Sequence, residues 1–156
     1  MSNFIKVKGF EDKKYKICIS IKGRSEEEIK SNILDLDINE VDLIEWRVDY
    51  YKDYDSIEKV IGILIMIKDN IGDIPLIFTF KNKNQGGIKD ITIRYYIKLI
   101  KSIANIKLVD IVNLDLTVDY GITSELTEFL YNKNIESILP QYNSDYNLFE
   151  YKIMNV

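Results

Sequence analysis

No histidine occurs anywhere in this chain, and cysteine occurs only once, at Cys18. Histidine is the side chain that most often moves protons near neutral pH and is the commonest metal ligand. Its absence, together with the single cysteine, excludes zinc fingers and histidine-rich metal sites. A lone cysteine also cannot form an intrachain disulfide, which fits a reducing compartment. We therefore expect no metal and a cytoplasmic location.

Long apolar runs and clusters of positive charge are missing as well. The longest apolar run, Val60–Ile67, is too short to span a bilayer, and the N-terminal residues mix charges without an apolar signal segment. The net charge is -4, the pI is about 5.0, and the lysines are spread without a basic block. Nucleic-acid binding needs concentrated positive charge. We expect neither a membrane nor a nucleic acid as a partner.

What the chain does contain is an alternation of short apolar strands with longer segments of helical spacing. Capping pairs begin the first two helical segments, Ser25 with Glu28 and Asp55 with Glu58. Strands separated by helices are typical of βαβ units in a parallel sheet. Nothing marks a linker, so we expect one α/β domain over residues 1–156. The expected strands are 16–21, 42–49, 75–81, 108–117 and 135–140.

The residues of these strands divide between two faces, because side chains alternate along a strand. In the second strand Ile44, Trp46 and Val48 share an apolar face, whereas Glu45 and Arg47 point the other way. The other strands also have one apolar face and one that becomes polar toward the C-terminal end. A doubly wound sheet needs two apolar faces, but a (β/α)8 barrel carries polar residues at the C-terminal ends of its strands. The pattern favours the barrel.

Simpler interpretations exist for each of these residues. Glu45 and Arg47 alone are also consistent with a solvated surface ion pair of little energetic value. The agreement of four strands favours a polar pocket instead. Trp46 is typical of a core anchor, Cys18 of a small buried apolar residue, and the segment 82–87 of a loop.

Four segments resemble type I 3-dehydroquinate dehydratase in their order and spacing. The strand EWRVD, followed one βα unit later by FTFK and a glycine pair, is the most specific part. The resemblance runs from about residue 6 to 138 and leaves a divergent tail at 139–156. It implies a single-domain (β/α)8 TIM barrel, truncated to about four βα units and a fifth strand. The segments are KICISIKG, DLIEWRVDY, DIPLIFTFKNKNQGG and LVDIVNLDL.

The resemblance also implies an activity. Members of this family are lyases of the shikimate pathway, which leads to the aromatic amino acids, and they convert 3-dehydroquinate to 3-dehydroshikimate without a metal or organic cofactor. A lysine forms a Schiff base with the substrate ketone, and a histidine moves protons. The imine withdraws electrons, so the neighbouring carbon loses a proton to a weak base. The small molecule 3-dehydroquinate is therefore the expected partner.

Carried over by position, the resemblance implies a set of substrate-binding residues. Lys81 stands where the family usually has an arginine, which keeps the charge but loses the bidentate fork. Gln85 stands where a glutamate is common, before the glycine pair. The expected substrate-binding residues are Glu45, Arg47 and Lys81, with Ser20, Gln85 and Asp115 as further candidates.

This sequence differs from the family pattern at the catalytic residues. The histidine position falls on Tyr142, and the Schiff-base lysine belongs to a sixth strand that these residues do not reach. We therefore expect a family member that is catalytically incomplete on its own. One alternative is a non-catalytic half-barrel, whose two unpaired strand edges self-associate or complement a partner. Others are a frameshifted or prematurely ended gene product, and a marginally stable fragment without a role.

Overall fold

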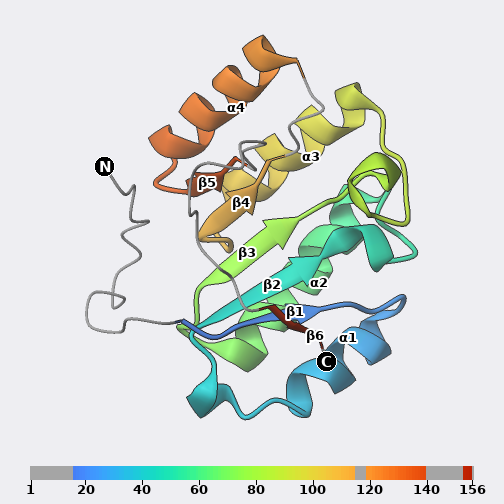
Figure 1. Cartoon of the computed structure of the whole chain (residues 1–156), viewed down its shortest axis with the longest axis vertical. Coiled ribbons are helices and arrows are strands. Elements are labelled where there is room, and N and C mark those ends of the chain that lie inside the picture. The colour runs from blue at the N-terminus through green and yellow to red at the C-terminus, as the bar shows by residue number, and fades with distance from the viewer. Residues whose placement is uncertain (1–15, 115–118, 140–152, 156) are drawn as a thin grey trace, which may run out of the picture.

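The computed structural model describes residues 16–114, 119–139 and 153–155, and in this part strands and helices alternate along the chain (Figure 1). The strands are shorter than the sequence predicted: each is three to five residues long and pairs with its neighbour over three or four. The elements are β1 (Cys18–Ile21), α1 (Glu26–Leu34), η1 (Ile38–Glu40), β2 (Leu43–Arg47), η2 (Val48–Tyr50), α2 (Ile57–Ile71), β3 (Leu76–Thr79), η3 (Lys83–Gln85), α3 (Ile93–Ile106), β4 (Ile111–Asn113), α4 (Tyr120–Asn132), β5 (Glu136–Ile138) and β6 (Ile153–Asn155).

The first five strands lie side by side in chain order, and every pair is parallel. The sixth strand, β6, pairs in parallel with the other side of β1, with Cys18 opposite Ile153. The half-barrel alternative assumes two unpaired strand edges. For β1 this is wrong, since β6 occupies its edge, whereas β5 is the last strand of the sheet in the part that the structure describes. β6 thus has the neighbour and the direction of the strand that closes a parallel barrel.

Side-chain caps fix where the first two long helices begin. Ser25 caps α1 as predicted, and its Oγ accepts the backbone N–H of Glu28 at 3.3 Å. The predicted cap of α2 is wrong by one residue. Ser56, rather than Asp55, accepts the N–H of Lys59 at 3.4 Å. Both side chains are good caps, so residue type alone does not decide between them.

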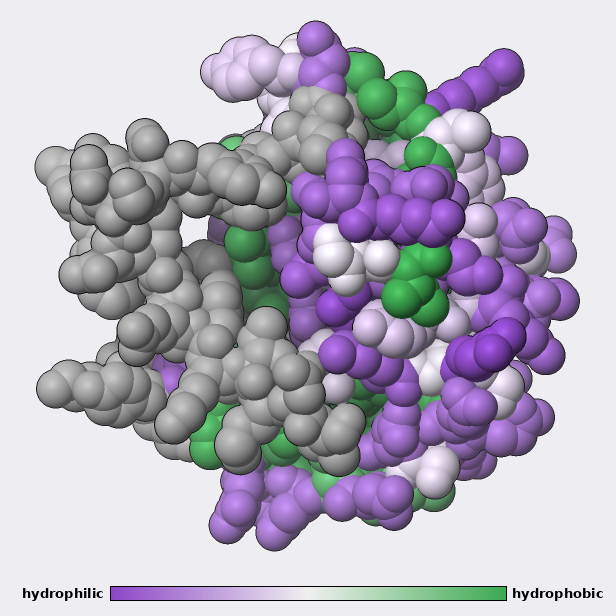
Figure 2. All heavy atoms as spheres, turned by 45° about the vertical axis from the view of Figure 1, so that its right-hand side comes forward, coloured by the Kyte–Doolittle hydropathy of each residue, from purple (hydrophilic) through white to green (hydrophobic). Residues whose placement is uncertain are grey.

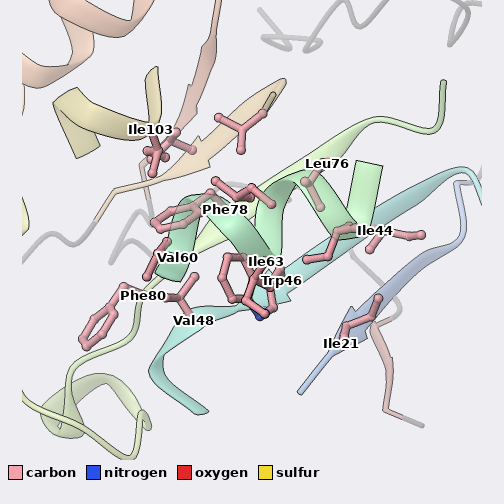
Figure 3. Close-up of a cluster of buried hydrophobic side chains, with 14 of the residues drawn as sticks. Ile21, Ile44, Trp46, Val48, Val60, Ile63, Leu76, Phe78, Phe80 and Ile103 are labelled. Atoms are coloured by element: carbon pink, nitrogen blue, oxygen red, sulfur yellow. The ribbon is translucent and has the colours of Figure 1, made fainter. Parts of the chain in front are cut away.

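All four α-helices pack on one face of the sheet, where the main hydrophobic core lies. Figure 3 shows Trp46, Phe78 and Ile63 meeting in this core between β2, β3 and α2. The rings of Trp46 and Phe78 meet edge to face, with their centroids 5.8 Å apart. The predicted apolar faces are confirmed for the described residues of the first four strands except Ile17, which precedes β1 and is 40% exposed. Those facing the helices are Ile19, Ile21, Ile44, Trp46, Val48, Leu76, Phe78, Phe80, Val112 and Leu114.

The opposite face, which we call the inner face, has a second and much smaller apolar cluster. It lies toward the N-terminal ends of the strands, and polar residues follow it toward the C-terminal ends. Helices on one face and strands in chain order are the arrangement of a (β/α)8 barrel wall. A doubly wound sheet would place helices on both faces. The small cluster consists of Cys18, Leu43, Ile77 and Ile111, with Ile138 packed against it.

Candidate functional site

Glu45 and Thr79 form a buried pair on the inner face of β2 and β3. The Thr79 hydroxyl donates a hydrogen bond of 2.7 Å to Oε1 of Glu45. The two residues are 5% and 1% exposed, so the carboxylate lies in a largely desolvated place. Such a carboxylate needs donors, and Thr79 supplies one of them. A ligand hydroxyl placed on this face has the second oxygen, Oε2, as a possible acceptor.

Arg47 lies opposite Thr79 in the β2–β3 ladder and forms a bidentate ion pair with Asp49. The Arg47 Nε–H donates to Oδ1 of Asp49, and Nη2 donates to Oδ2, both at 2.9 Å. Asp49 is fully buried and Arg47 is 7% exposed. A guanidinium has five N–H groups, so three N–H groups of Arg47 lie outside this fork. They are the groups that can face an anionic or carbonyl ligand.

The surroundings of Arg47 keep it charged. Burial by itself lowers the pKa of Arg47, but the hydrogen bonds and charge of Asp49, with the charges of Glu45 and Tyr50, outweigh burial and raise it. The ring of Tyr50 also lies against two cations. The Arg47 guanidinium carbon and the Lys22 Nζ lie 5.1 Å and 5.4 Å from its centroid, within the range of a cation–π contact.

Two buried residues of β1 border this charged group. Ser20 pairs with Glu45 in the β1–β2 register and is 4% exposed. Its hydroxyl has no hydrogen-bond partner within the part of the chain that the structure describes, which leaves a buried donor for a ligand. Cys18 lies in the apolar cluster below it. Burial, and to a smaller extent the charge of Glu45, raises the pKa of the Cys18 thiol to about 12, so it is neutral and a poor nucleophile at neutral pH.

The loop after β3 carries the two remaining candidates that the structure describes. Lys81 and Gln85 are both partly buried, and Gln85 ends the short helix η3. The backbone N–H of Lys81 donates to Oδ1 of Asp49 at 3.4 Å, and that of Ile88 donates to Oδ2 at 3.3 Å. Both ends of this loop therefore meet the carboxylate that also holds Arg47.

Among residues 16–114, 119–139 and 153–155, no three histidine, cysteine or acidic side chains gather as metal ligands. Nor does any helix in those ranges have the length and apolarity to cross a bilayer. Figure 2 brings the C-terminal ends of the strands forward and shows a largely hydrophilic surface with apolar side chains in separate patches.

A family model described as type I 3-dehydroquinase matches residues 17–155, which is most of the chain. The chain belongs to this family. It is 35% identical over 128 residues to the 3-dehydroquinate dehydratase of Clostridium botulinum, a match that covers 82% of this chain and 50% of that protein. With the Clostridioides difficile enzyme it shares 35% identity over 132 residues, covering 85% of this chain and 51% of the relative.

Solved structures of 3-dehydroquinate dehydratases have the same fold over the matched part. The enzyme from Clostridium difficile, solved with covalently modified comenic acid, superposes with a TM-score of 0.73 at 35% identity, over 80% of this chain and 49% of that one. The enzyme from Geobacillus kaustophilus gives 0.75 at 20% identity, over 81% and 49%. The chain spans about half the length of the family members it matches. In the described residues, the parallel strands β1 to β5 and the four α-helices are accordingly about half of their (β/α)8 barrel, with β6 added beside β1.

The structure brings together most of the site residues that the sequence predicted. Glu45, Arg47 and Ser20 lie on adjacent strands of the inner face, and the loop with Lys81 and Gln85 is tied to Arg47 through Asp49. Asp115 and Tyr142 lie outside the described residues. The roles of all these residues in binding remain predictions.

Sequence reasoning missed two members of this group, Asp49 and Thr79. Each shares the alternation of a predicted site residue, since Asp49 follows Arg47 by two positions and Thr79 precedes Lys81 by two. That signal was present, but it shows only a common face. It does not show that Asp49 receives the guanidinium fork or that Thr79 donates to Glu45.

Proposed function

We propose that this chain carries the part of a 3-dehydroquinate dehydratase site that binds the substrate, and that by itself it does not dehydrate 3-dehydroquinate. The observation that carries the first half is the buried group of Glu45, Thr79, Arg47 and Asp49 at the C-terminal end of the inner face. Buried charges are costly even when hydrogen bonds offset part of the penalty, and clusters of them are typical of functional sites. In a member of this family, that function is recognition of the substrate.

The chemistry of the group suits this substrate. 3-Dehydroquinate is a small ring with hydroxyl groups, a carboxylate and a ketone. Glu45 and Ser20 offer an acceptor and a hydroxyl for the substrate hydroxyls, whereas Arg47 and Lys81 offer positive charge for the carboxylate or the ketone oxygen. Lys81 presents its charge as a single point, so we expect weaker recognition than an arginine fork provides.

Catalysis needs two further groups. The family pattern uses a histidine to move protons, and this chain has no histidine. It also uses a Schiff-base lysine, which the resemblance places on a sixth strand, after the strands that these residues match. These residues act as a unit, and loss of one removes most of the rate. We therefore propose binding without turnover. We also propose a cytoplasmic location, which the single, buried cysteine supports.

Binding is tested by titrating 3-dehydroquinate into 15N-labelled protein and following the Arg47 side-chain Nε–H signal by NMR. We expect a Kd of about 1 mM, which corresponds to about -4 kcal/mol. Glu45→Gln should weaken binding about tenfold. The matched control, Glu58→Gln on the exposed side of α2, should leave it unchanged. Absence of any signal change at the solubility limit of the ligand would overturn the proposal.

Turnover is tested on the same samples. We expect no growth of the enone absorbance of 3-dehydroshikimate, and no mass increase after borohydride reduction in the presence of 3-dehydroquinate. A lysine labelled by borohydride would contradict the second half of the proposal, because it would show a Schiff base formed within these residues.

A second candidate is an interaction module. The favouring observation is that β5, with Glu136 exposed, is a terminal strand of the sheet in the described part of the chain. A parallel edge of this kind can pair with another chain. Light scattering after size exclusion separates the candidates, since a monomer at all concentrations disfavours pairing of β5 with a second copy.

A further inference from the structure

Asp49 is the charged residue of the candidate site with the most hydrogen bonds in the described part of the chain, and all four of them go to Arg47 and the backbone. It lies in η2, directly after β2, and is fully buried. Each of its two oxygens accepts one hydrogen bond from Arg47 and one from the backbone. Oδ1 accepts from Arg47 Nε and from the Lys81 N–H, whereas Oδ2 accepts from Arg47 Nη2 and from the Ile88 N–H.

The local fold explains how residue 49 reaches residue 47. On an extended strand, the side chains of residues two positions apart lie on the same face. They point away from the sheet in parallel directions, so they do not turn toward each other. Here β2 ends at Arg47, and the turn η2 follows at once, with the Tyr51 N–H donating to the Val48 carbonyl at 3.0 Å. The turn brings the Asp49 carboxylate beside the guanidinium. The fork is thus produced by the end of the strand and not by the strand itself.

The loop from Lys81 to Ile88 is folded back on itself, and this brings its two ends to the same carboxylate. Gly86 has φ of 82°, and the Gly87 N–H donates to the Asn82 carbonyl at 2.9 Å. A Cβ at Gly87 would overlap the carbonyl of Lys81, so only glycine permits the close approach. The loop thereby carries the Ile88 N–H back toward the end of β3.

We propose that Asp49 is a positioning residue that couples Arg47 to the loop carrying Lys81 and Gln85. Its buried carboxylate accepts hydrogen bonds both from the guanidinium and from backbone N–H groups at the two ends of the loop. The hydrogen bonds that join Arg47 to the two ends of the loop all meet at the Asp49 carboxylate, so the coupling passes through Asp49. Its consequence for binding rests on the proposed function, whereas the coupling itself is a property of the fold and is measurable without a ligand.

Amide hydrogen exchange tests the coupling directly. Asp49→Asn keeps the size of the side chain but replaces one acceptor oxygen with a donor group, which then faces N–H groups. We expect exchange at Ile88 and Lys81 to become about tenfold faster. The matched control is Asp110→Asn. Asp110 also accepts a backbone N–H from the β3 region, that of Leu76 at 2.9 Å, but at the other end of the strand, so it should leave Ile88 unchanged.

A second variant separates coupling from a local structural role. Arg47→Lys preserves the charge but cannot form the fork, and it touches neither backbone amide. If Asp49 couples the two, exchange at Ile88 rises about threefold in Arg47→Lys, because the carboxylate loses its fixed orientation. Unchanged exchange at Ile88 in this variant overturns the proposal, and so does an equal rise in Asp110→Asn. Should Asp49→Asn fail to fold, Arg47→Lys still decides.

The ligand experiment is kept apart from this result. With 3-dehydroquinate as the probe, Asp49→Asn should weaken binding more than Arg47→Lys does, because it disturbs both Arg47 and the loop. If the unmodified chain does not bind 3-dehydroquinate, the proposed function fails while the exchange data still test the coupling. Equal binding by Asp49→Asn and the unmodified chain contradicts the positioning role.

Discussion

The outer face of the sheet buries Ile44, Trp46 and Leu76 under four helices, whereas the inner face of the same strands places Glu45, Arg47 and Thr79 at its C-terminal end. Adjacent residues of one strand thus have opposite effects on the free energy of folding. The outer residues remove apolar surface from water, which is the main stabilising term in folding. The inner residues hold charges out of water, at a cost that hydrogen bonds only offset.

The two faces of the sheet differ in how much apolar surface they bury. The outer core joins all four helices to the sheet in one cluster, but the inner apolar cluster has only a few members. Substitutions on the outer face should therefore act on the free energy of unfolding. Substitutions at the polar end of the inner face should act on ligand binding, with smaller losses in the free energy of unfolding than those of the outer core.

The largest expected effect comes from a matched pair of leucines. Leu76 belongs to the outer core and is fully buried, and Leu43 belongs to the inner cluster and is 4% exposed. We expect Leu76→Ala to lower the free energy of unfolding by about 4 kcal/mol and Leu43→Ala by about 2 kcal/mol, because the larger cluster leaves the larger unfilled cavity. Urea unfolding measures both. Equal losses would show that the inner cluster is packed as completely as the outer core.

The outer face was predictable from sequence, since a strict alternation of large apolar residues has few other interpretations. Trp46 and Phe78 illustrate this, because each is flanked by residues of the opposite face and each lies in the core. The inner face was predictable only as a set of residues that share a side. Its pairings depend on register and turns, and these are set by contacts with residues far along the chain.

Asp49 and β6 could not be predicted from the sequence, for two different reasons. The sequence predicts a strand through residue 49, and only the turn η2, which follows β2 at once, makes Asp49 the partner of Arg47. β6 is three residues long and lies in the segment interpreted as divergent. So short a strand carries no periodic signal, and its place beside β1 arises from an edge that would otherwise stay unpaired.

A smaller effect is expected from the polar pair of the inner face. Thr79→Val keeps the shape of the side chain but removes the donor to the buried Glu45 carboxylate. We expect a loss of about 2 kcal/mol in the free energy of unfolding, because hydrogen bonds to charged groups are the stronger ones. In the Glu45→Gln background the same substitution should cost about 1 kcal/mol, as for a neutral pair. A double-mutant cycle measures the coupling, and equal costs in both backgrounds would contradict it.

The smallest expected effect concerns Cys18 and appears only at high pH. Burial raises the pKa of its thiol from 9.0 to about 12, so in the folded state the thiol keeps its proton after the unfolded chain has lost it. The unfolded state then binds fewer protons, and stability falls as the pH rises from about 9 toward 12.

Relative to Cys18→Ala, the unmodified chain should lose about 1.4 kcal/mol of unfolding free energy by pH 10 and nothing below about pH 8. The alanine variant is the necessary reference, because tyrosines and lysines titrate in the same range. Unfolding curves measured across this range decide the point. If the two proteins keep a constant difference up to pH 10, the thiol titrates as it does in water, and the apolar end of the inner face is open to solvent.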